Sequence, residues 1–331
     1  MISMPPRFIC PACRTPVTAA GASYECRGCR RRFPVVLGIP DFRLTDDPWL
    51  SIDKDRAKAI RLEQCTSGQS FAEMVASYWK MTPSTPAARA EGFIDHVLRA
   101  EHRTGQWLQA AGLLDGGTSG SWLDLGCGTG DLGVSAHPGQ IVIAIDIALR
   151  WLVVARRRLA ERGCTNVYLA CANANALPLP DASIGCALSL GLFEHLADVL
   201  PVVQEARRVL VGGGELLFRT TNRYSLLPEP HVGLWGVGFL PRPTAIRYVR
   251  WRTGERFDTH HPHSARELRK ALREAGFGHV SVRPARALDS DIARFRSASV
   301  LATPYNRCAA VPVLSRGLSW VAPLLDGRCV A

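Results

Sequence analysis

The sequence contains no run of about 18 uncharged apolar residues, which is the length that a membrane-spanning helix requires. Its first residues, MISMPPRFICPAC, lack the apolar stretch of a secretory signal peptide. Long low-complexity tracts are also missing, and hydrophobic residues make up 47% of the 331 positions. We therefore expect a folded, cytoplasmic protein without a transmembrane segment.

Acidic residues are scarce relative to basic ones. The chain has 29 Asp and Glu against 40 Lys and Arg, which gives a formal charge of +11 at pH 7. This balance favours anionic partners or an anionic membrane surface. An Arg-rich background composition explains it equally well, because the arginines are scattered along the chain rather than gathered in one block. Charge alone therefore leaves the class of partner open.

Cysteine, in contrast, is abundant: the chain has 11, and four of them form two close pairs. Cys10 and Cys13 make one CxxC motif and Cys26 and Cys29 make another, with 12 residues between the pairs. Each motif can direct two thiolates at one point, and two such knuckles complete a tetrahedral Zn²⁺ site. A redox dithiol is the alternative, which the doubled motif disfavours. We predict a structural zinc ribbon over residues 1–43, folded by its metal.

The segment that follows the cysteines reads RRFPVVLGIPDF over residues 31–42. Together with the two CxxC motifs it resembles the small zinc-ribbon proteins that bind and activate methyltransferases, which often end in a similar G-I-P-D stretch. Residues 44–105 then form a charged linker and a helical lead-in, with helical spacing of apolar residues from residue 87 onward. Tyr78 and Trp79 lie in this lead-in and either cover the active site or pack in the core.

A glycine-rich turn follows a short apolar strand at residues 121–125. The turn reads GCGTG over residues 126–130, and a helical pattern comes after it. Glycine is required because the backbone must turn sharply and approach a ligand closely. A second strand, IVIAID, ends in Asp146, where a carboxylate can accept hydrogen bonds from both hydroxyls of a ribose. A nicotinamide dinucleotide site competes at this point, because GTGDLG loosely fits its fingerprint.

Two later motifs decide between these cofactors. A third strand leads into NANALPLPD at residues 173–181, and a fourth is followed by Glu194 and His195. With DLGCGTG, these motifs resemble the ubiquinone- and menaquinone-biosynthesis type of class I methyltransferase over residues 110–286. The resemblance implies a Rossmann-like α/β fold: a seven-stranded, mostly parallel sheet with helices on both faces and an antiparallel last strand, next to the zinc ribbon.

The same resemblance implies S-adenosylmethionine as the cofactor and gives roles to single residues. The glycines of the turn would hold its methionine end, and Asp124 would fix the turn and bind the amino group. Asn173 and Ala174 would bind the adenine, Asn173 through its side-chain oxygen although the family usually has Asp there. The predicted cofactor-binding residues are Asp124, Gly126, Cys127, Gly128, Gly130, Asp146, Ile147, Asn173, Ala174 and Leu190.

Methyl transfer from a sulfonium is an in-line displacement, so positioning of the reactants supplies much of the catalysis. A base is needed only where the acceptor must lose a proton early. Glu194 and His195 are the predicted catalytic residues, and His195 is the better base because its ordinary pKa suits neutral pH. A structural or cofactor-side role for this histidine is the alternative.

A segment rich in Pro, Gly and aromatic residues, 222–263, interrupts the pattern after the fifth strand. We expect it to form the acceptor pocket, with some of its apolar residues buried against the core. Histidines at 260, 261 and 263 suggest a metal, but no further ligand stands at a suitable spacing, so we expect His260 to contact the acceptor instead. The predicted substrate-binding residues are Tyr224, Glu229, His231, Trp235, Phe239 and His260.

These patterns place the methyltransferase domain at residues 106–290 and a C-terminal extension, expected to pack on it, at 291–331. The favoured function is transfer of a methyl group to oxygen on a small or glycosylated biosynthetic intermediate. One alternative is an RNA base methyltransferase that uses the ribbon to bind RNA, which makes nucleic acid the less favoured partner. Another is a non-catalytic, cofactor-binding partner protein. The sequence determines neither the acceptor nor the oligomeric state.

Overall fold

The computed structural model describes residues 6–82, 87–114, 120–289 and 299–331. The chain divides into two compact units, Met1–Cys186 (unit 1) and Ala187–Ala331 (unit 2). The first part of the predicted C-terminal extension, up to residue 298, lies outside the described residues. Within the described ranges, every helix is too short or too polar to cross a membrane.

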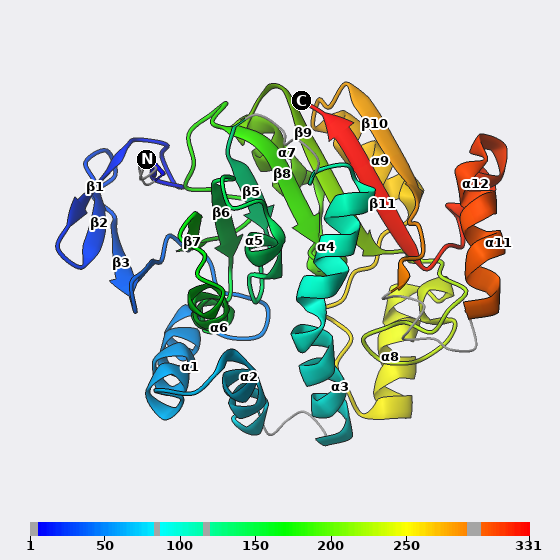
Figure 1. The fold of residues 1–331 in the computed structure, drawn as a ribbon, viewed down its shortest axis with the longest axis horizontal. Coiled ribbons are helices and arrows are strands. Elements are labelled where there is room, and N and C mark those ends of the chain that lie inside the picture. Colours follow the sequence, from blue (N-terminus) through cyan, green and yellow to red (C-terminus); the bar gives the residue numbers. More distant parts are fainter. Residues whose placement is uncertain (1–5, 83–86, 115–119, 290–298) are drawn as a thin grey trace. The chain divides into compact units, whose positions relative to one another are not determined.

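Unit 1 begins with a small antiparallel sheet (Figure 1). Phe42 is fully buried beside it, and its ring centroid lies 5.0 to 5.4 Å from those of Phe8, Tyr24 and Phe33. These four rings form the apolar core of the ribbon. The strands, hydrogen-bonded in this order, are β1 (Val17–Ala20), β2 (Ser23–Cys26), β3 (Arg32–Val36) and β4 (Ile39–Pro40).

Four helices separate the ribbon from the main sheet. Two of them lie where the sequence predicted a charged linker. The charged residues of α1 conceal an apolar face on which Ala59 and Leu62 are fully buried. Ser70 and Glu73 form a capping box that starts α2. The helices are α1 (Ile52–Cys65), α2 (Phe71–Lys80), α3 (Ala87–Leu98) and α4 (Ala100–Ala110).

The aromatic pair at the end of α2 packs inside unit 1. The Tyr78 side chain is buried, and its ring centroid lies 4.1 Å from that of Trp151. Trp79 stacks on Phe93 of α3, with 4.9 Å between the centroids and 11° between the planes. Of the two roles open for this pair, the structure supports that of core aromatics.

The main sheet contains seven strands in the order β10-β11-β9-β8-β5-β6-β7, which confirms the predicted Rossmann-like α/β architecture. In unit 1, the strands β5, β6 and β7 are parallel. All four residues of β5 are buried, as expected for a strand covered on both faces. The elements are β5 (Trp122–Leu125), α5 (Asp131–Ser135), β6 (Val142–Asp146), α6 (Leu149–Glu161) and β7 (Val167–Cys171).

Strand β8 (Ile184–Leu190) runs across the boundary between the units, and η1 (Phe193–His195) follows it. The insertion at 222–263 has a small core of its own, built from Val232, Val237, Ala245, Val249 and Phe257. Its helix α8 (Arg242–Thr253) was not anticipated from the sequence. The other elements of unit 2 are α7 (Leu200–Val209), β9 (Leu210–Thr221), η2 (Val237–Phe239), α9 (Ala265–Glu274), β10 (His279–Pro284), α11 (Ser299–Ala310), α12 (Pro312–Leu318) and β11 (Leu324–Val330).

The C-terminal segment is more than an extension that packs on the domain. Its strand β11 lies between β9 and β10 and is antiparallel to both (Figure 1). The expected antiparallel last strand is therefore present, but residues 324–330 form it. The strand itself was not foreseen, because its sequence, LLDGRCV, contains Asp, Gly and Arg and shows no clear alternation of apolar and polar residues.

Candidate functional site

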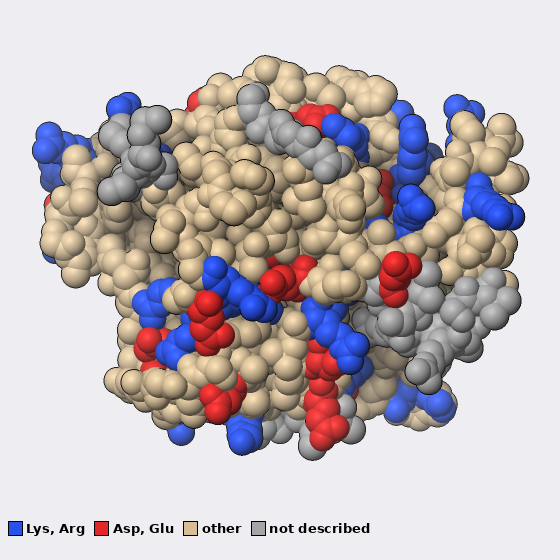
Figure 2. All heavy atoms as spheres, in the orientation of Figure 1, with Lys and Arg blue, Asp and Glu red and all other residues tan. Residues whose placement is uncertain are grey.

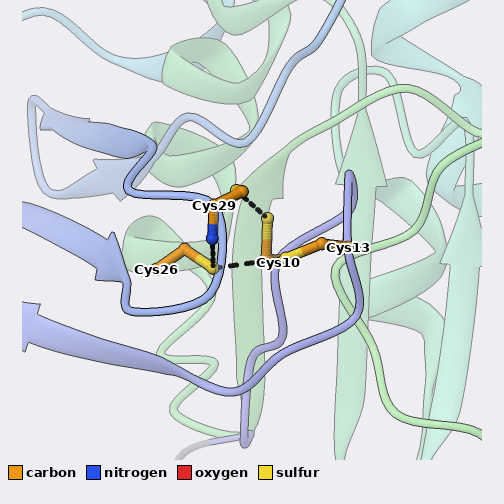
Figure 3. Close-up of side chains that lie close together, drawn as sticks. All are labelled: Cys10, Cys13, Cys26 and Cys29. Atoms are coloured by element: carbon orange, nitrogen blue, oxygen red, sulfur yellow. Dashed lines mark hydrogen bonds between the residues drawn. The ribbon is translucent and has the colours of Figure 1, made fainter.

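The four paired cysteines converge at one end of the ribbon (Figure 3). Cys10 Sγ lies 3.5 Å from Cys29 Sγ, and Cys13 Sγ lies 3.4 Å from Cys26 Sγ. All four sulfur atoms lie within 4.8 Å of one another. Zn–S bonds of about 2.3 Å place the sulfurs of a tetrahedral site about 3.8 Å apart. The donor set and its spacing therefore fit a zinc ion.

Each CxxC motif folds in the same way. The backbone N–H of Arg14 donates to Cys10 O at 2.8 Å, and that of Arg30 donates to Cys26 O at 2.9 Å. Both arginines have a positive φ, 60° and 59°, although neither is glycine. Two non-glycine residues in this costly conformation at the same place in the motif indicate that the backbone is bent to direct the thiols at one point.

The G-I-P-D-F tail of the ribbon is joined to the edge of the main sheet within unit 1. Asp41 forms a parallel bridge with Cys171, the last residue of β7, and the Phe42 N–H donates to Cys171 O at 2.7 Å. Behind this junction, the buried Arg43 side chain makes two hydrogen bonds to Asp41, of 2.7 and 2.8 Å, and one of 2.7 Å to Asp55. Ribbon and sheet are therefore connected by both backbone and charged contacts.

This buried ion network extends into α6. Asp55 Oδ1 accepts a hydrogen bond of 2.5 Å from Arg150, and its Oδ2 accepts the Leu149 N–H at 2.8 Å. Arg150 also binds Asp47 at 2.5 Å. The sequence did not predict this network, because Arg150 stands about a hundred positions from Asp47 and Asp55 and each residue alone resembles a surface charge. Buried charges are rare unless they are paired, and each charge of this network has a partner of opposite sign. The contacts of Asp55 with Leu149 and Arg150 hold α1 to α6.

The glycine turn leads from β5 into α5 and is hydrogen-bonded to the end of β6, where Ile145 O accepts the Gly126 N–H at 2.8 Å. Gly126, Gly128 and Gly130 all have positive φ, of 79°, 48° and 75°. A Cβ on Gly130 would lie 3.0 Å from the Cβ of Ala155, whereas one on Gly128 would point into open space. Asp146 Oδ2 accepts the Gly128 N–H at 2.8 Å, so the strand-end carboxylate fixes the turn. The open side of Gly128 is where a ligand can approach the backbone.

Asp124 carries an unusual carboxyl group. It is 3% exposed, and among the described residues its Oδ2 is a buried oxygen without a hydrogen-bond partner. Burial, and then the charges of Asp131 and Asp146, raise its pKa well above the ordinary value. A buried acceptor without a donor is costly in a finished structure. A cationic donor such as an amino group would satisfy this oxygen and offset the repulsion.

The side chain of Asn173, predicted to bind adenine, is already engaged. Its Oδ1 accepts the Leu44 N–H at 2.7 Å, and its Nδ2 donates to Thr45 Oγ1 at 2.7 Å. The predicted adenine contact through this oxygen therefore competes with the chain that follows the ribbon. The neighbouring Ala174 is partly exposed just after the end of β7, and its adenine contact stays a prediction.

The remaining cofactor candidates differ in accessibility. Cys127 is buried in the turn, and burial raises the pKa of its thiol well above the ordinary value. Ile147 is partly exposed after β6, and its carbonyl accepts a 3.0 Å hydrogen bond from Arg43. Leu190 ends β8 in unit 2 and is partly exposed.

Glu194 and His195, the predicted catalytic pair, have different surroundings in unit 2. Glu194 is buried, its Oε2 accepts a 2.6 Å hydrogen bond from Thr220, and its backbone O accepts the His261 N–H at 2.6 Å. It therefore holds η1 to β9 and to the 258–263 loop. His195 is partly exposed, and burial is the first cause that lowers its pKa below the ordinary value.

Three predicted residues of the acceptor side gather around His195. The ring centroid of His231 lies 5.2 Å from that of His195, and the centroid of His260 lies 5.1 Å from His195 and 4.4 Å from His231. Glu229 contacts His231, with 2.7 Å between Oε1 and Nδ1. Burial, followed by the charges of the other histidines, lowers the pKa of His260 to about 2. The sequence predicted no metal site in this region, because these rings come from three separate segments.

The three aromatic candidates form a different group. Trp235 and Phe239 are 63% and 47% exposed, with ring centroids 6.4 Å apart, and the Phe239 centroid lies 5.6 Å from that of Tyr224. The Trp235 indole donates to Leu226 O at 3.0 Å. The structure therefore separates the predicted substrate residues into a histidine–glutamate cluster and an exposed aromatic group.

The seven-stranded sheet has an antiparallel strand β11, a glycine turn after β5 and a carboxylate at the end of the neighbouring β6, which is the Rossmann-like arrangement of a nucleotide-binding site. Residues 123–218 match the family model described as methyltransferase domain. This part of the chain is a methyltransferase domain, as the sequence motifs indicated.

Curated relatives match only part of the chain. An uncharacterized 37.1 kDa protein in a Streptomyces fradiae transposon is 42% identical over 108 residues, 31% of each chain. A demethylmenaquinone methyltransferase of Thermus thermophilus is 35% identical over 118 residues, 35% of this chain and 50% of that protein. The chain thus spans half or less of the length of these relatives. A solved complex of the Haloferax volcanii Trm112 methyltransferase activator with a methyltransferase contains a chain 18% identical, with a TM-score of 0.48, covering 79% of this chain and 97% of that one.

Proposed function

We propose that this chain is an S-adenosylmethionine-dependent methyltransferase that transfers a methyl group to oxygen on a small or glycosylated biosynthetic intermediate. The observation that carries the proposal is the unsatisfied carboxylate oxygen of Asp124, next to a glycine turn whose Gly128 is open to a ligand. The methionine end of this cofactor carries an ammonium group, which needs a carboxylate acceptor. It also needs a turn without Cβ atoms, so that it can lie close to the backbone. The match of residues 123–218 to methyltransferase domains supports the same cofactor.

The residues of unit 1 would hold the cofactor by distinct contacts. Asp124 would bind the amino group, and the turn at Gly126, Gly128 and Gly130 would enclose the methionine end. Each carboxylate oxygen of Asp146 already accepts one hydrogen bond: Oδ2 accepts the Gly128 N–H and Oδ1 accepts the Ala148 N–H, both at 2.8 Å. Each carboxylate oxygen accepts further hydrogen bonds, so Asp146 retains the capacity to bind ribose hydroxyls.

When bound, S-adenosylmethionine supplies an electrophilic methyl group on a sulfonium. This chain must orient an acceptor oxygen and remove its proton or leave it to water. The buried Glu194, held by Thr220, is suited to positioning η1, and His195 is the residue of the pair that remains accessible. We assign the acceptor side to the segment 222–263, because Glu229, His231 and His260 lie with His195 in unit 2.

We further propose that the four-cysteine centre holds a structural Zn²⁺. All four donors are thiols, which leaves no coordination position for a reacting water. The free energy of metal binding at such a site stabilises the folded state of the segment that carries the ligands. Because the ribbon tail pairs with β7 and bonds Asn173, the zinc would also support the wall of the cofactor-binding unit.

Surface charge gives less support to a nucleic-acid acceptor. On the face shown in Figure 2, Lys and Arg side chains over α1 to α4 are interspersed with Asp and Glu, so the described residues of unit 1 form no continuous basic stripe there. Affinity for nucleic acid rests on phosphate neutralisation by grouped cations. A small-molecule acceptor is therefore the first class to screen.

Calorimetric titration with S-adenosylmethionine tests the proposal. We expect micromolar binding to the zinc-loaded protein, with affinity reduced about 10-fold or more in Asp124→Ala and in Asp146→Ala, since each loses a hydrogen bond to a charged or polyhydroxy group worth about 1.5–3 kcal/mol. Asp53→Ala is the matched control, because the Asp53 side chain is 95% exposed. Absence of heat from the folded wild type would refute the enzyme assignment and favour the partner-protein alternative.

A further inference from the structure

Unit 2 contains a second cluster of metal-ligating side chains that is separate from the cysteines. His195 comes from η1, His231 from the loop after β9 and His260 from the loop after α8, yet each offers a ring nitrogen within 4.8 Å of the other two. We propose that these three histidines bind a divalent transition-metal ion of the zinc class. The proposal concerns metal binding alone, so it stands or fails independently of methyl transfer.

The ring positions match those around a tetrahedral metal. Metal–nitrogen bonds of about 2.0–2.1 Å place the centroids of three imidazoles about 5 Å from one another. The observed separations are 5.2 Å for His195 and His231, 5.1 Å for His195 and His260, and 4.4 Å for His231 and His260. A tetrahedral metal requires ring nitrogens about 3.3 Å apart, so binding would draw together nitrogens that lie within 4.8 Å of one another, two of them on the partly exposed His231 and His260.

Glu229 supplies the support that metal-binding histidines usually have. Its Oε1 lies 2.7 Å from His231 Nδ1, so Nε2 is the ring nitrogen that would bind the metal. Its Oε2 accepts the N–H groups of His231 and Val232 at 2.8 and 2.9 Å, so the carboxylate itself is held rigidly. A carboxylate behind a histidine fixes the tautomer and makes the ring a stronger ligand. The side chain of Glu229 is only 10% exposed, which strengthens this effect.

The loop that carries His260 is also fixed. Arg242 of α8 donates to His260 O and to Asp258 O, both at 2.7 Å. The buried Phe257 stacks on the His260 ring, with 5.6 Å between centroids and 8° between planes. A ligand held by its own backbone and by ring stacking loses little freedom on binding a metal.

The two metal centres would differ in kind. Four cysteines close the ribbon site, whereas three histidines leave one position for a water molecule or an oxygen atom of another molecule. A metal ion lowers the pKa of a water molecule or hydroxyl group that it binds at such an open position. If the acceptor is an oxygen compound, as the proposed function holds, the site gives a way to bind and deprotonate it, and this last step alone rests on that proposal.

Metal content of the full-length protein tests the site. We expect two zinc ions per chain in wild type after gel filtration, measured by elemental analysis, and one per chain in His231→Ala and in His260→Ala. His279→Ala, which removes an exposed histidine of β10, should retain two. Co²⁺ added to chains that hold zinc only in the ribbon should give a visible ligand-field spectrum without a thiolate charge-transfer band.

Glu229→Gln separates a metal site from a merely packed histidine cluster. It preserves the shape of the side chain but removes its charge, and we expect it to weaken Co²⁺ binding about 10- to 100-fold. One zinc per wild-type chain, with no Co²⁺ spectrum, would overturn the proposal even where a histidine variant fails to fold. A second zinc ion that persists in both folded histidine variants would overturn it as well.

Discussion

The side-chain amide of Asn173 and residue Thr45 are joined by three hydrogen bonds. Asn173 Nδ2 donates to Thr45 Oγ1 at 2.7 Å and to Thr45 O at 3.3 Å, and Oδ1 accepts the Thr45 N–H at 3.3 Å. An aspartate, which the family usually has at this position, has no N–H to donate. The asparagine is therefore suited to hold the segment that leaves the zinc ribbon.

Asn173→Asp tests this assignment. We expect it to lower the free energy of unfolding by about 1–3 kcal/mol, because it leaves Thr45 O without its donor and places a carboxylate beside it. Urea unfolding measures the change, and Asn175→Asp at a neighbouring exposed position should be nearly neutral. If Asn173 serves the adenine instead, the variant would bind S-adenosylmethionine more tightly at unchanged stability.

Removal of the ribbon metal should destabilise unit 1. The ribbon tail forms a bridge with Cys171 and places Arg43 in the buried ion network, so unfolding of the ribbon withdraws these contacts as well. We expect a strong chelator, or Cys26→Ser, to lower the midpoint of thermal unfolding by several degrees. Cys65→Ser, at an exposed cysteine, is the control. An unchanged midpoint after verified metal loss would show that the ribbon is energetically independent.

Acid should weaken the junction between ribbon and sheet. Burial alone would raise the pKa of Asp41, but hydrogen bonds and charges from Arg43 and Arg56 hold it below the ordinary value. A carboxyl with a lowered folded pKa stabilises the fold above its unfolded pKa of about 3.9, and this contribution is lost as pH falls through the folded value.

We therefore expect Asp41→Asn to cost about 3 kcal/mol at neutral pH, since it removes one partner of a buried pair. The difference from wild type should shrink as pH falls below about 4. Urea unfolding of both proteins at a series of pH values gives the measurement. A cost that stays constant down to strongly acidic pH would show that the charge of Asp41 is unimportant.

Gly327 should tolerate no side chain. It lies opposite Phe218 in the pairing of β11 with β9, and a Cβ there would be 2.1 Å from the Phe218 ring. We expect Gly327→Ala to destabilise the protein by about 1–3 kcal/mol through overpacking. Gly317→Ala, where a Cβ meets open space, should be neutral or slightly stabilising. Recovery of stability in Gly327→Ala combined with Phe218→Leu would confirm the clash, and no recovery would assign the cost to the backbone.

The sequence predicted what is encoded locally. The spacing of Cys10 to Cys29 indicated the ribbon, and the strand, glycine turn and Asp146 indicated the sheet and its cofactor side. The C-terminal strand β11 was missed because its identity depends on β9, about a hundred positions earlier. For the same reason the meeting of His195, His231 and His260 was not foreseen: no local pattern records which loops fold toward one another. The adenine-binding role of Asn173 was predicted from the resemblance to a family that usually has aspartate at this position. The contacts of Asn173 with Thr45 explain why asparagine is suited here.

The place of β11 has a consequence for how the protein forms in the cell. This strand lies between β9 and β10 and pairs with both. Each of them therefore lacks its β11 partner until residues 324–330 have been synthesised. The ribbon and β5 to β7, in contrast, have all their partners early in translation. Domains fold largely as their chain emerges from the ribosome. Unit 2 should therefore spend longer with unpaired strand edges, and would be the half that depends on chaperones during synthesis.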